Sequence, residues 1–333
     1  MRKQKNKLAK NIIIIIISAV VLIFITIQLY PLIFTANFEE YEKKYSDTKG
    51  LPYEVYKFLY LDEKEEKEKF IWDQIDFGKY YALIISNNKY RLLPNLRNAI
   101  NDGDAIASIL EKQYQFQVHH IKNANEDKIY DSFDKLKNLS QNTNILIYYS
   151  GHGKLDKNAN AGYWLPTDAH NIKKSKWISD EDIKAELRSL NSKHILVIAD
   201  SCFSGTILRR NSPHVKVENF IKLSMINELV KTTTRMALTS GGESPVVDKK
   251  GNSKHSVFAK ELLQILEENE EIILASQVFK KIKSRLLLNE KQKPQFDYIS
   301  NTGSHTGGDF IFIKISQFVH HLAQFTCFFS NAK

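Results

Sequence analysis

Cysteine is scarce in this chain of 333 residues, which contains only Cys202 and Cys327. Two cysteines cannot build the disulfide framework of a small secreted domain, so that class is excluded. Zinc-finger, RNP and basic-helix patterns are also absent, and the lysines behind the net charge of +9 are scattered among glutamates. A solvated basic surface therefore explains the charge better than a nucleic-acid partner does. No internal repeat is present, and 43% hydrophobic residues are enough for a sizeable core.

Near its start the chain has one long apolar run, from Ile12 to Tyr30, which is interrupted only by Ser18, Thr26 and Gln28. As a helix this run would measure roughly 28 Å, about the thickness of a bilayer's hydrocarbon core. Basic residues precede it and acidic residues follow it. The positive-inside rule then predicts a single-pass anchor that leaves the rest of the chain on the non-cytoplasmic side, periplasmic or extracellular. A cleaved signal peptide is the alternative, although no clean small-x-small cleavage site follows the run.

This anchor divides the sequence into five parts. They are a basic cytoplasmic N-terminus (1–10), a transmembrane signal-anchor (11–34), a charged spacer (35–78), a large α/β domain (79–315) and an apolar C-terminal tail (316–333). Charges of alternating sign in the spacer favour a solvated helix. The tail is too short and too often interrupted by polar residues to span a membrane, so we expect it to pack on the domain or on a partner.

Apolar runs and amphipathic stretches alternate from residue 80 onward. Strands are predicted near Tyr80–Ser86, Gln117–Ile121, Asn144–Ser150, His194–Asp200, Arg235–Ser240 and Asp309–Ile315. Helices are predicted near Asn98–Lys112, Asp127–Leu139, Asp180–Leu190, Val257–Glu268 and Ser276–Leu288. This alternation indicates an α/β fold, in which a mostly parallel sheet is covered by helices on both faces. Between residues 205 and 235 the periodicity fades into a polar, basic segment.

Two short motifs, fifty residues apart, follow two of the apolar runs. Ser-Gly-His-Gly at 150–153 follows the run 145–149, and Asp-Ser-Cys-Phe-Ser-Gly at 200–205 follows the run 195–199. Ligands bind beyond the carboxyl ends of parallel strands, so two neighbouring strands would bring His152 and Cys202 to one cleft. There the imidazole would stabilise the thiolate, which is the nucleophile. The pattern predicts a cysteine peptidase dyad. A serine hydrolase that uses Ser204 is disfavoured, because no strand end presents that residue.

Glycines flank His152 on both sides, which is expected where a substrate backbone passes close to the chain. The backbone N–H groups of Gly153 and Cys202 are the natural donors to a tetrahedral oxyanion. No third catalytic side chain is evident in the sequence.

These motifs resemble those of the caspase-like peptidases, peptidase family C14, and within it the metacaspase-type and bacterial caspase-domain proteins. The resemblance runs from about residue 80 to about residue 315, with further family segments in order at 81–90, 101–102, 162–166, 237–242, 255–259 and 307–310. It implies a caspase-like α/β/α sandwich with a six-stranded sheet. It also implies a thiol endopeptidase that cleaves proteins or peptides through a thioester. A catalytically silent caspase-fold scaffold or regulatory binding protein is the alternative, against which the intact His152 and Cys202 argue.

The resemblance to metacaspases also suggests a specificity. It implies that Asp102, Ser150 and Asp200 line an acidic S1 pocket, which selects Arg or Lys by charge. Ser240 is a further candidate for substrate binding. Arg97 argues the other way, since it lies close to where caspases have an S1 arginine. It is one residue out of place, and we interpret it as a surface residue.

The sequence leaves two questions open, namely whether the protein binds Ca²⁺ and whether its chain is processed by cleavage. Some metacaspases need Ca²⁺, and Asp168, Asp180 and Glu181 fall near the matching positions, where oxygen ligands would suit that ion. A further family aspartate is Arg209 here, which puts a cation where a ligand should be. We expect no required cofactor, and Ca²⁺ is only a candidate activator. Asp180 could instead favour the start of the helix that it begins. The segment between Gly205 and Arg235 is either a processing region, as in the family, or a surface loop.

Overall fold

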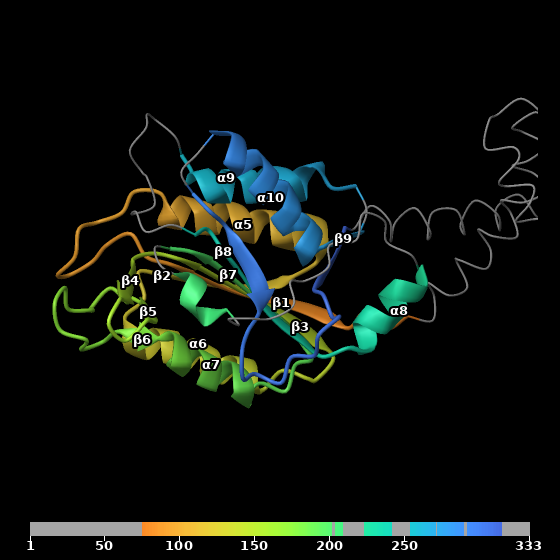
Figure 1. The fold of residues 1–333 in the computed structure, drawn as a ribbon, viewed down its shortest axis with the longest axis horizontal. Coiled ribbons are helices and arrows are strands. Elements are labelled where there is room, and N and C mark those ends of the chain that lie inside the picture. The colour runs from red at the N-terminus through yellow and green to blue at the C-terminus, as the bar shows by residue number, and fades with distance from the viewer. Residues whose placement is uncertain are drawn as a thin grey trace, which may run out of the picture. The chain divides into compact units, whose positions relative to one another are not determined.

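The computed structural model describes residues 75–201, 204–208, 223–241, 254–270, 272–289 and 292–314 (Figure 1). The chain divides into two units, residues 1–70 and 71–333, and everything described belongs to the second. The predicted anchor (11–34), almost all of the spacer and the tail (316–333) lie outside the described residues, so these assignments stay predictions. Within the described ranges, no helix has both the length and the apolar character needed to cross a membrane.

Six strands form one central sheet in the order β10-β8-β7-β3-β1-β2. Their bounds are β1 Lys79–Ser86, β2 Gln117–Lys122, β3 Thr143–Ser150, β7 His194–Asp200, β8 Thr234–Thr239 and β10 Gln295–Tyr298. All neighbours are parallel except β10, which runs antiparallel to β8. The central strands β3 and β7 are nearly continuous apolar runs, as a parallel sheet buried on both faces requires. The predicted α/β class with a mostly parallel six-stranded sheet is confirmed.

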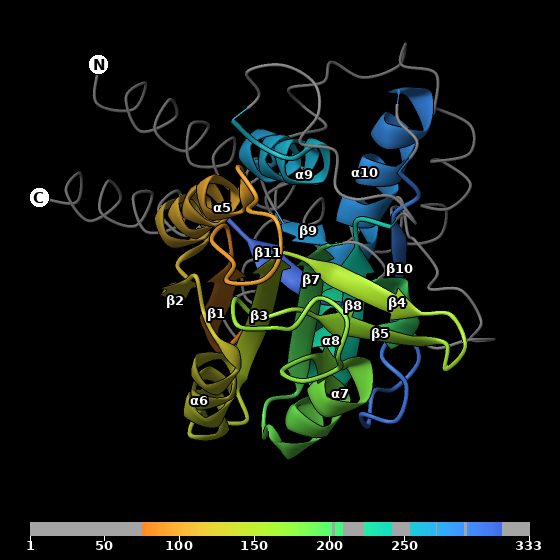
Figure 2. The same cartoon turned by 90° about the vertical axis from the view of Figure 1, so that its left-hand side faces the viewer.

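Helices cover both faces of this sheet (Figures 1 and 2). On one face lie α5 (Ala99–Tyr114), α9 (Val257–Glu268) and α10 (Ala275–Asn289), and on the other lie α6 (Glu126–Lys137) and α7 (Asp180–Ser189). Successive side chains of a strand point to opposite faces. Leu146 and Tyr148 of β3 therefore join the core on the α5 and α9 side, whereas Ile145 and Ile147 join the core on the α6 and α7 side.

The sixth predicted strand is present, but it does not belong to the main sheet. The segment Asp309–Ile315 contributes only β11 (Ile311–Ile313), which pairs with β9 (Ile272–Leu274) in a separate two-stranded sheet. The place at the edge of the main sheet belongs to β10, whose sequence Gln-Phe-Asp-Tyr is short and half polar. Burial explains the error, because Phe310 and Phe312 are part of the same core as α5 and α9. An apolar run reports that a segment is buried but does not identify its partner strand.

Two further parts of the fold were not predicted. The segment expected to be irregular contains a 3₁₀ turn (Ser204–Ile207) and α8 (Leu223–Lys231), which packs through Ile226 and Leu229. A three-stranded antiparallel sheet also follows β3, formed by β4 (Gly153–Asp156), β5 (Ala161–Trp164) and β6 (Ile178–Ser179). Stacking of Tyr149 on Trp164, with ring centroids 4.3 Å apart, attaches this small sheet to the end of β3.

Candidate active site

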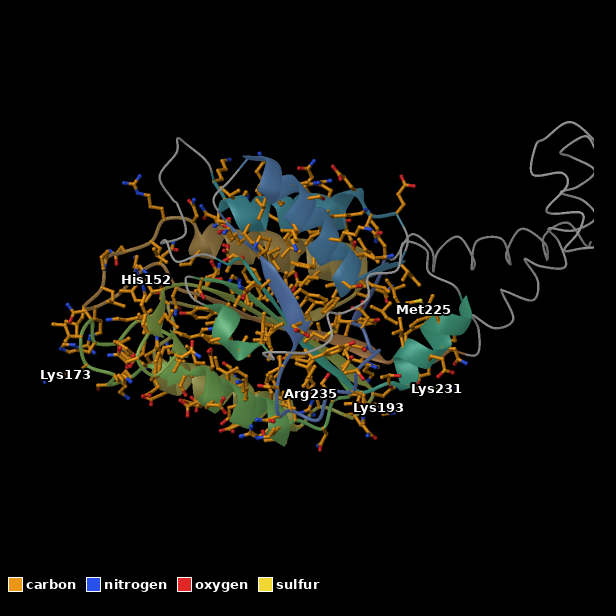
Figure 3. The ribbon with its side chains drawn as sticks, viewed as in Figure 1. His152, Lys173, Lys193, Met225, Lys231 and Arg235 are labelled. Carbon is orange, nitrogen blue, oxygen red and sulfur yellow. The ribbon has the colours of Figure 1, made fainter. Side chains whose placement is uncertain are left out.

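His152 lies between the end of β3 and the start of β4, at one end of the domain (Figure 3). Its backbone N–H donates to the Tyr90 hydroxyl at 2.8 Å, and the two rings pack with centroids 4.6 Å apart. Its ring Nε2 lies 2.8 Å from the carbonyl oxygen of Pro94. Both partners belong to residues 87–98, which follow β1, so this loop fixes the orientation of the imidazole.

The contact with Pro94 also determines the tautomer of His152. A carbonyl oxygen can only accept a hydrogen bond, so Nε2 must carry the proton that it donates. In the neutral imidazole, Nδ1 then holds the lone pair and can take up a proton. A backbone carbonyl leaves no signature in a sequence, and Pro94 was not predicted for this reason.

Gly151 has a local structural reason to be glycine. A Cβ at this position would lie 2.7 Å from the Tyr90 hydroxyl oxygen and 2.9 Å from that of Tyr149. Tyr149 in turn donates to the backbone carbonyl of His152 at 2.7 Å. The tyrosine hydroxyls therefore account for Gly151 without the passing substrate backbone that we inferred from the sequence.

The strand that leads to Cys202 lies directly beside the strand that leads to His152. β3 and β7 are parallel neighbours, with Ser150 opposite Asp200. His152 and Cys202 each follow this pair by two residues, so both loops leave the same edge of the sheet. The adjacency on which the predicted dyad depends is thus confirmed. Cys202 itself lies outside the described residues, and the dyad stays a prediction.

The two carboxylates predicted for the S1 pocket are brought together inside the protein. Asp102 of α5 and Asp200 of β7 are each 1% exposed, and both bond to Ser256 at the start of α9. The Ser256 N–H lies 3.2 Å from both oxygens of Asp102, and its hydroxyl donates to Asp200 Oδ2 at 2.5 Å. His255 Nδ1 lies 2.8 Å from Asp102 Oδ1. The pair is therefore bonded to the residues that precede α9 and is not exposed at the surface.

Ser150 belongs to the same face of the sheet as this pair. Residues opposite each other in a parallel ladder point to one face, so the side chains of Ser150 and Asp200 both lie on the α5 and α9 side. Tyr148, two residues earlier, is fully buried there. Burial, together with the nearby charges of Asp200 and Asp102, raises the pKa of Tyr148 well above its ordinary value. All three predicted S1 residues thus lie in one buried polar region.

Ser240 and Arg97 occupy different environments. Ser240 is 1% exposed. Its backbone N–H donates to the Ala199 carbonyl at 3.0 Å, and its hydroxyl donates to the Ser201 carbonyl at 3.4 Å. Ser240 therefore forms buried hydrogen bonds to the backbone of the residues that precede Cys202. Arg97 is exposed on the loop after β1, which agrees with its interpretation as a surface residue.

The three residues considered for calcium do not converge. Asp168 accepts a hydrogen bond from the backbone of Glu126 at the start of α6. Asp180 accepts from the Gly162 N–H at 3.1 Å and from the Thr206 hydroxyl, and burial raises its pKa. Glu181 is exposed and pairs with Lys184 at 2.8 Å. Across the described residues, no group of three or more His, Cys, Asp and Glu side chains could hold a metal ion. These residues do not fit a shared Ca²⁺ site, and Ca²⁺ activation stays a prediction from the sequence.

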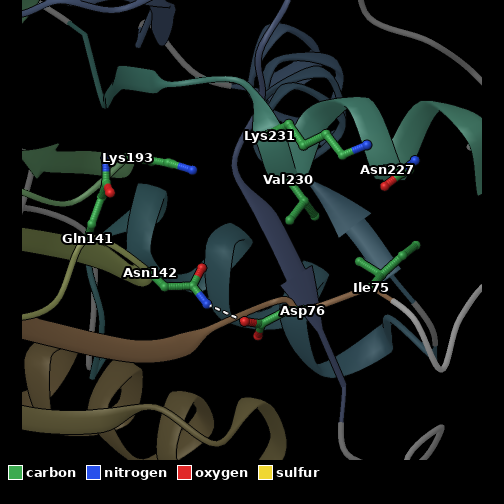
Figure 4. Close-up of a pocket in the computed structure, with 8 residues that line it drawn as sticks. All are labelled: Ile75, Asp76, Gln141, Asn142, Lys193, Asn227, Val230 and Lys231. Atoms are coloured by element: carbon green, nitrogen blue, oxygen red, sulfur yellow. Dashed lines mark hydrogen bonds between the residues drawn. The ribbon is translucent and has the colours of Figure 1, made fainter.

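A cavity of about 420 Å³ lies at the other end of the strands (Figure 4). Its lining includes Asp76, three residues before β1, and Asn142 and Lys193, which directly precede β3 and β7. The other lining residues are Ile75, Gln141, Asn227, Val230 and Lys231. Figure 3 shows Lys193 and Lys231 far from His152. The Asn142 amide donates to Asp76 at 2.6 Å, so part of the lining is bonded to itself. This cavity is not part of the candidate active site.

The fold and the site define an α/β/α domain that presents an oriented imidazole at the carboxyl edge of its sheet, beside the strand leading to a cysteine. A family model described as the caspase domain of peptidase C14 matches residues 79–305, and the chain belongs to this family. A search of curated proteins finds no match. Among solved structures, the chain is similar to the crystal structure of protein GSU0716 from Geobacter sulfurreducens. The identity is 16%, the TM-score is 0.45, and the match covers 66% of this chain and 92% of that one.

Besides the Pro94 carbonyl, two features of the site were missed at the sequence level. Tyr90 and His255–Ser256 fall in segments that resemble the family, but no role was assigned to them. A serine directly before the apolar helix 257–268 is an N-cap signal. That signal identifies the cap but not the carboxylates that it contacts.

Proposed function

We propose that this protein is a cysteine endopeptidase with Cys202 as nucleophile and His152 as general base and acid. The observation that carries the proposal is the contact of His152 Nε2 with the Pro94 carbonyl, which leaves the lone pair on Nδ1. The imidazole occupies the end of the strand next to the one that leads to Cys202. Membership of the caspase family supports the same chemistry.

The reaction proceeds in two halves. Nδ1 of His152 takes the proton of the Cys202 thiol, and the thiolate attacks the carbonyl carbon of the scissile peptide bond. The tetrahedral intermediate collapses when the imidazolium gives its proton to the leaving amine, which departs and leaves a thioester. Water then attacks the thioester while His152 accepts a proton from it. Collapse of the second intermediate returns the proton to the sulfur and releases the carboxylic acid.

The N–H of Gly153 is a suitable donor to the oxyanion in both halves. The Leu165 N–H donates to the His152 carbonyl at 3.0 Å, and the next pair in register is Gly153 and Trp164. Hydrogen-bonded and non-hydrogen-bonded pairs alternate along an antiparallel ladder. The Gly153 N–H therefore points away from β5, toward the open side of the edge strand β4. The Cys202 N–H is the second donor, on sequence grounds.

We assign the P1 preference to Arg or Lys. The supporting observation is that Asp102 and Asp200, from two separate elements, bond to one residue, which keeps two carboxylates close together. A guanidinium placed against such a pair forms charge-assisted, bidentate hydrogen bonds. An aspartate at P1 would instead face two like charges and would be rejected.

A peptide library with all residues at P1 tests this proposal, using the wild-type protein and Cys202→Ala with and without Ca²⁺. We expect cleavage after Arg and Lys by the wild type and no turnover by the variant. Equal cleavage after Asp and Arg would contradict the acidic pocket. Turnover that survives in Cys202→Ala would contradict the mechanism, and a wild type that cleaves nothing would favour the silent scaffold.

A further inference from the structure

Ser256 connects two buried carboxylates that come from different parts of the chain. Its backbone N–H reaches both oxygens of Asp102 at 3.2 Å, and its hydroxyl reaches Asp200 Oδ2 at 2.5 Å. The same hydroxyl accepts the Ala259 N–H at 2.9 Å and so caps α9. One residue of 3% exposure therefore makes contacts with α5, β7 and α9 at once.

These contacts matter because two carboxylates cannot be buried side by side without compensation. Each needs hydrogen bonds or a positive partner to remain charged at low exposure. Ser256 supplies a donor to each, and the N-terminus of α9 adds the positive end of a helix dipole. The start of α9 thus supplies hydrogen-bond donors to both members of the Asp102–Asp200 pair.

His255 occupies the place next to this pair that a basic ligand would need. Its Nδ1 lies 2.8 Å from Asp102 Oδ1, and its side chain is 30% exposed whereas Asp102 is 1% exposed. The imidazole thus lies at Asp102 with part of its surface in contact with solvent. A cation that approaches Asp102 from this solvent-exposed side would have to displace it.

We propose that Ser256 is a positioning residue for the P1 preference, and that a basic P1 side chain binds Asp102 by replacing His255. This inference rests on the proposed function and deepens it, since it assigns the specificity to the start of α9. Ser256 need not touch the substrate. It acts by holding Asp102 and Asp200 as a pair that can accept one guanidinium or ammonium group.

The first test compares Ser256→Ala with Ser256→Thr, which keeps a hydroxyl. The readout is the ratio of kcat/KM values for two peptides that differ only in Arg or norleucine at P1. We expect Ser256→Ala to lower this ratio at least tenfold, mainly through KM for the Arg peptide, and Ser256→Thr to retain it. Ser179→Ala is the matched control, because Ser179 caps α7 in the same way and its cap contacts are with Asp182. A ratio in Ser256→Ala equal to that of Ser179→Ala would overturn the inference.

The second test needs no catalysis and remains informative if Ser256→Ala folds poorly. Agmatine, a small guanidinium compound, is titrated into Cys202→Ala and into Cys202→Ala with His255→Ala. We expect agmatine to raise the melting temperature of both proteins, and at lower concentration when His255 is absent. Equal or weaker binding without His255 would overturn the displacement step.

The two tests separate the inference from the function. If the wild type shows Cys202-dependent cleavage after Arg but Ser256→Ala leaves the ratio unchanged, the function stands and the role of Ser256 is wrong. If no Cys202-dependent cleavage occurs, the proposed function is wrong. Agmatine binding then still supports or contradicts the carboxylate pair as a cation site.

Discussion

The parallel strands of the central sheet begin at one end of the sheet, its amino edge, and finish at the other, its carboxyl edge. Both of these edges bury charged groups, but the hydrogen-bond partners of those groups differ. At the amino edge, Arg235 at the start of β8 donates to the backbone carbonyls of Leu187, Leu190 and Ser192 at 2.6 to 3.3 Å. At the carboxyl edge, Asp102 and Asp200 accept hydrogen bonds from Ser256, and Asp102 also bonds to an imidazole that is partly exposed.

The difference indicates what each edge can do. Carbonyls at the end of a helix cannot move away without unfolding it, so the bonds of Arg235 stabilise the fold. The side chain of His255 can rotate away from Asp102, so its bond can be exchanged for one to a ligand. We therefore expect changes at the carboxyl edge to alter turnover and specificity, and changes at the amino edge to alter stability.

The largest effect should come from His152→Ala. Loss of the proposed general base should lower kcat/KM on an Arg peptide by about 10³-fold or more, since proton transfer contributes 10²- to 10⁴-fold and the proposed thiolate would lose its partner. The double variant Lys193→Ala with Lys231→Ala, at the amino-edge cavity, is the control and should retain wild-type kinetics. Comparable losses in both proteins would remove the functional distinction between the edges.

Arg235→Met should be the most destabilising change at the amino edge. It leaves the last carbonyls of α7 buried without their donor, which should lower the free energy of unfolding by about 3–4 kcal/mol. Urea denaturation monitored by circular dichroism measures this loss. Arg285→Met is the matched control: Arg285 forms partly exposed ion pairs with Glu268 and Glu261, so less than about 1 kcal/mol is expected. Similar losses in the two variants would contradict the role of Arg235.

Some parts of the fold and the site could be predicted from the sequence, and others could not. Long apolar strands and amphipathic helices were located well, and the helix 257–268 has the predicted bounds, because periodic burial determines both kinds of element. The edge strand β10 was missed since four half-polar residues become a strand only through pairing with β8. In the site, His152 follows a strong strand signal. The Pro94 carbonyl and the contact of Ser256 with Asp200 depend on tertiary structure, which a single sequence does not report.

Asp309 gives the amino edge a pH dependence with a definite sign. Burial raises its pKa from 3.8 to about 6, although the backbone N–H groups of Ser276 and Phe310 donate hydrogen bonds to it. The folded protein then binds this proton more tightly than the unfolded chain, so the stabilising contribution is complete below about pH 4 and is lost as the pH rises to about 6. Relative to the wild type, Asp309→Asn should gain up to about 2–3 kcal/mol over this range and stay level above it. Urea denaturation between pH 4 and 8 checks this, and a constant difference at all pH values would contradict it.

The smallest effect should come from a residue at the carboxyl edge that caps a helix without contacting the carboxylate pair. Ser179→Ala removes the capping box of α7, in which the hydroxyl accepts the Asp182 N–H at 3.1 Å. Loss of such a cap costs about 1 kcal/mol of stability. Calorimetry should show a small drop in melting temperature while kcat/KM for the Arg peptide stays at the wild-type value. If turnover fell as we expect it to in Ser256→Ala, the carboxyl edge would respond to the loss of any helix cap. The exchangeable bond of His255 to Asp102 and the fixed bonds of Arg235 would then not explain a difference in function between the two edges.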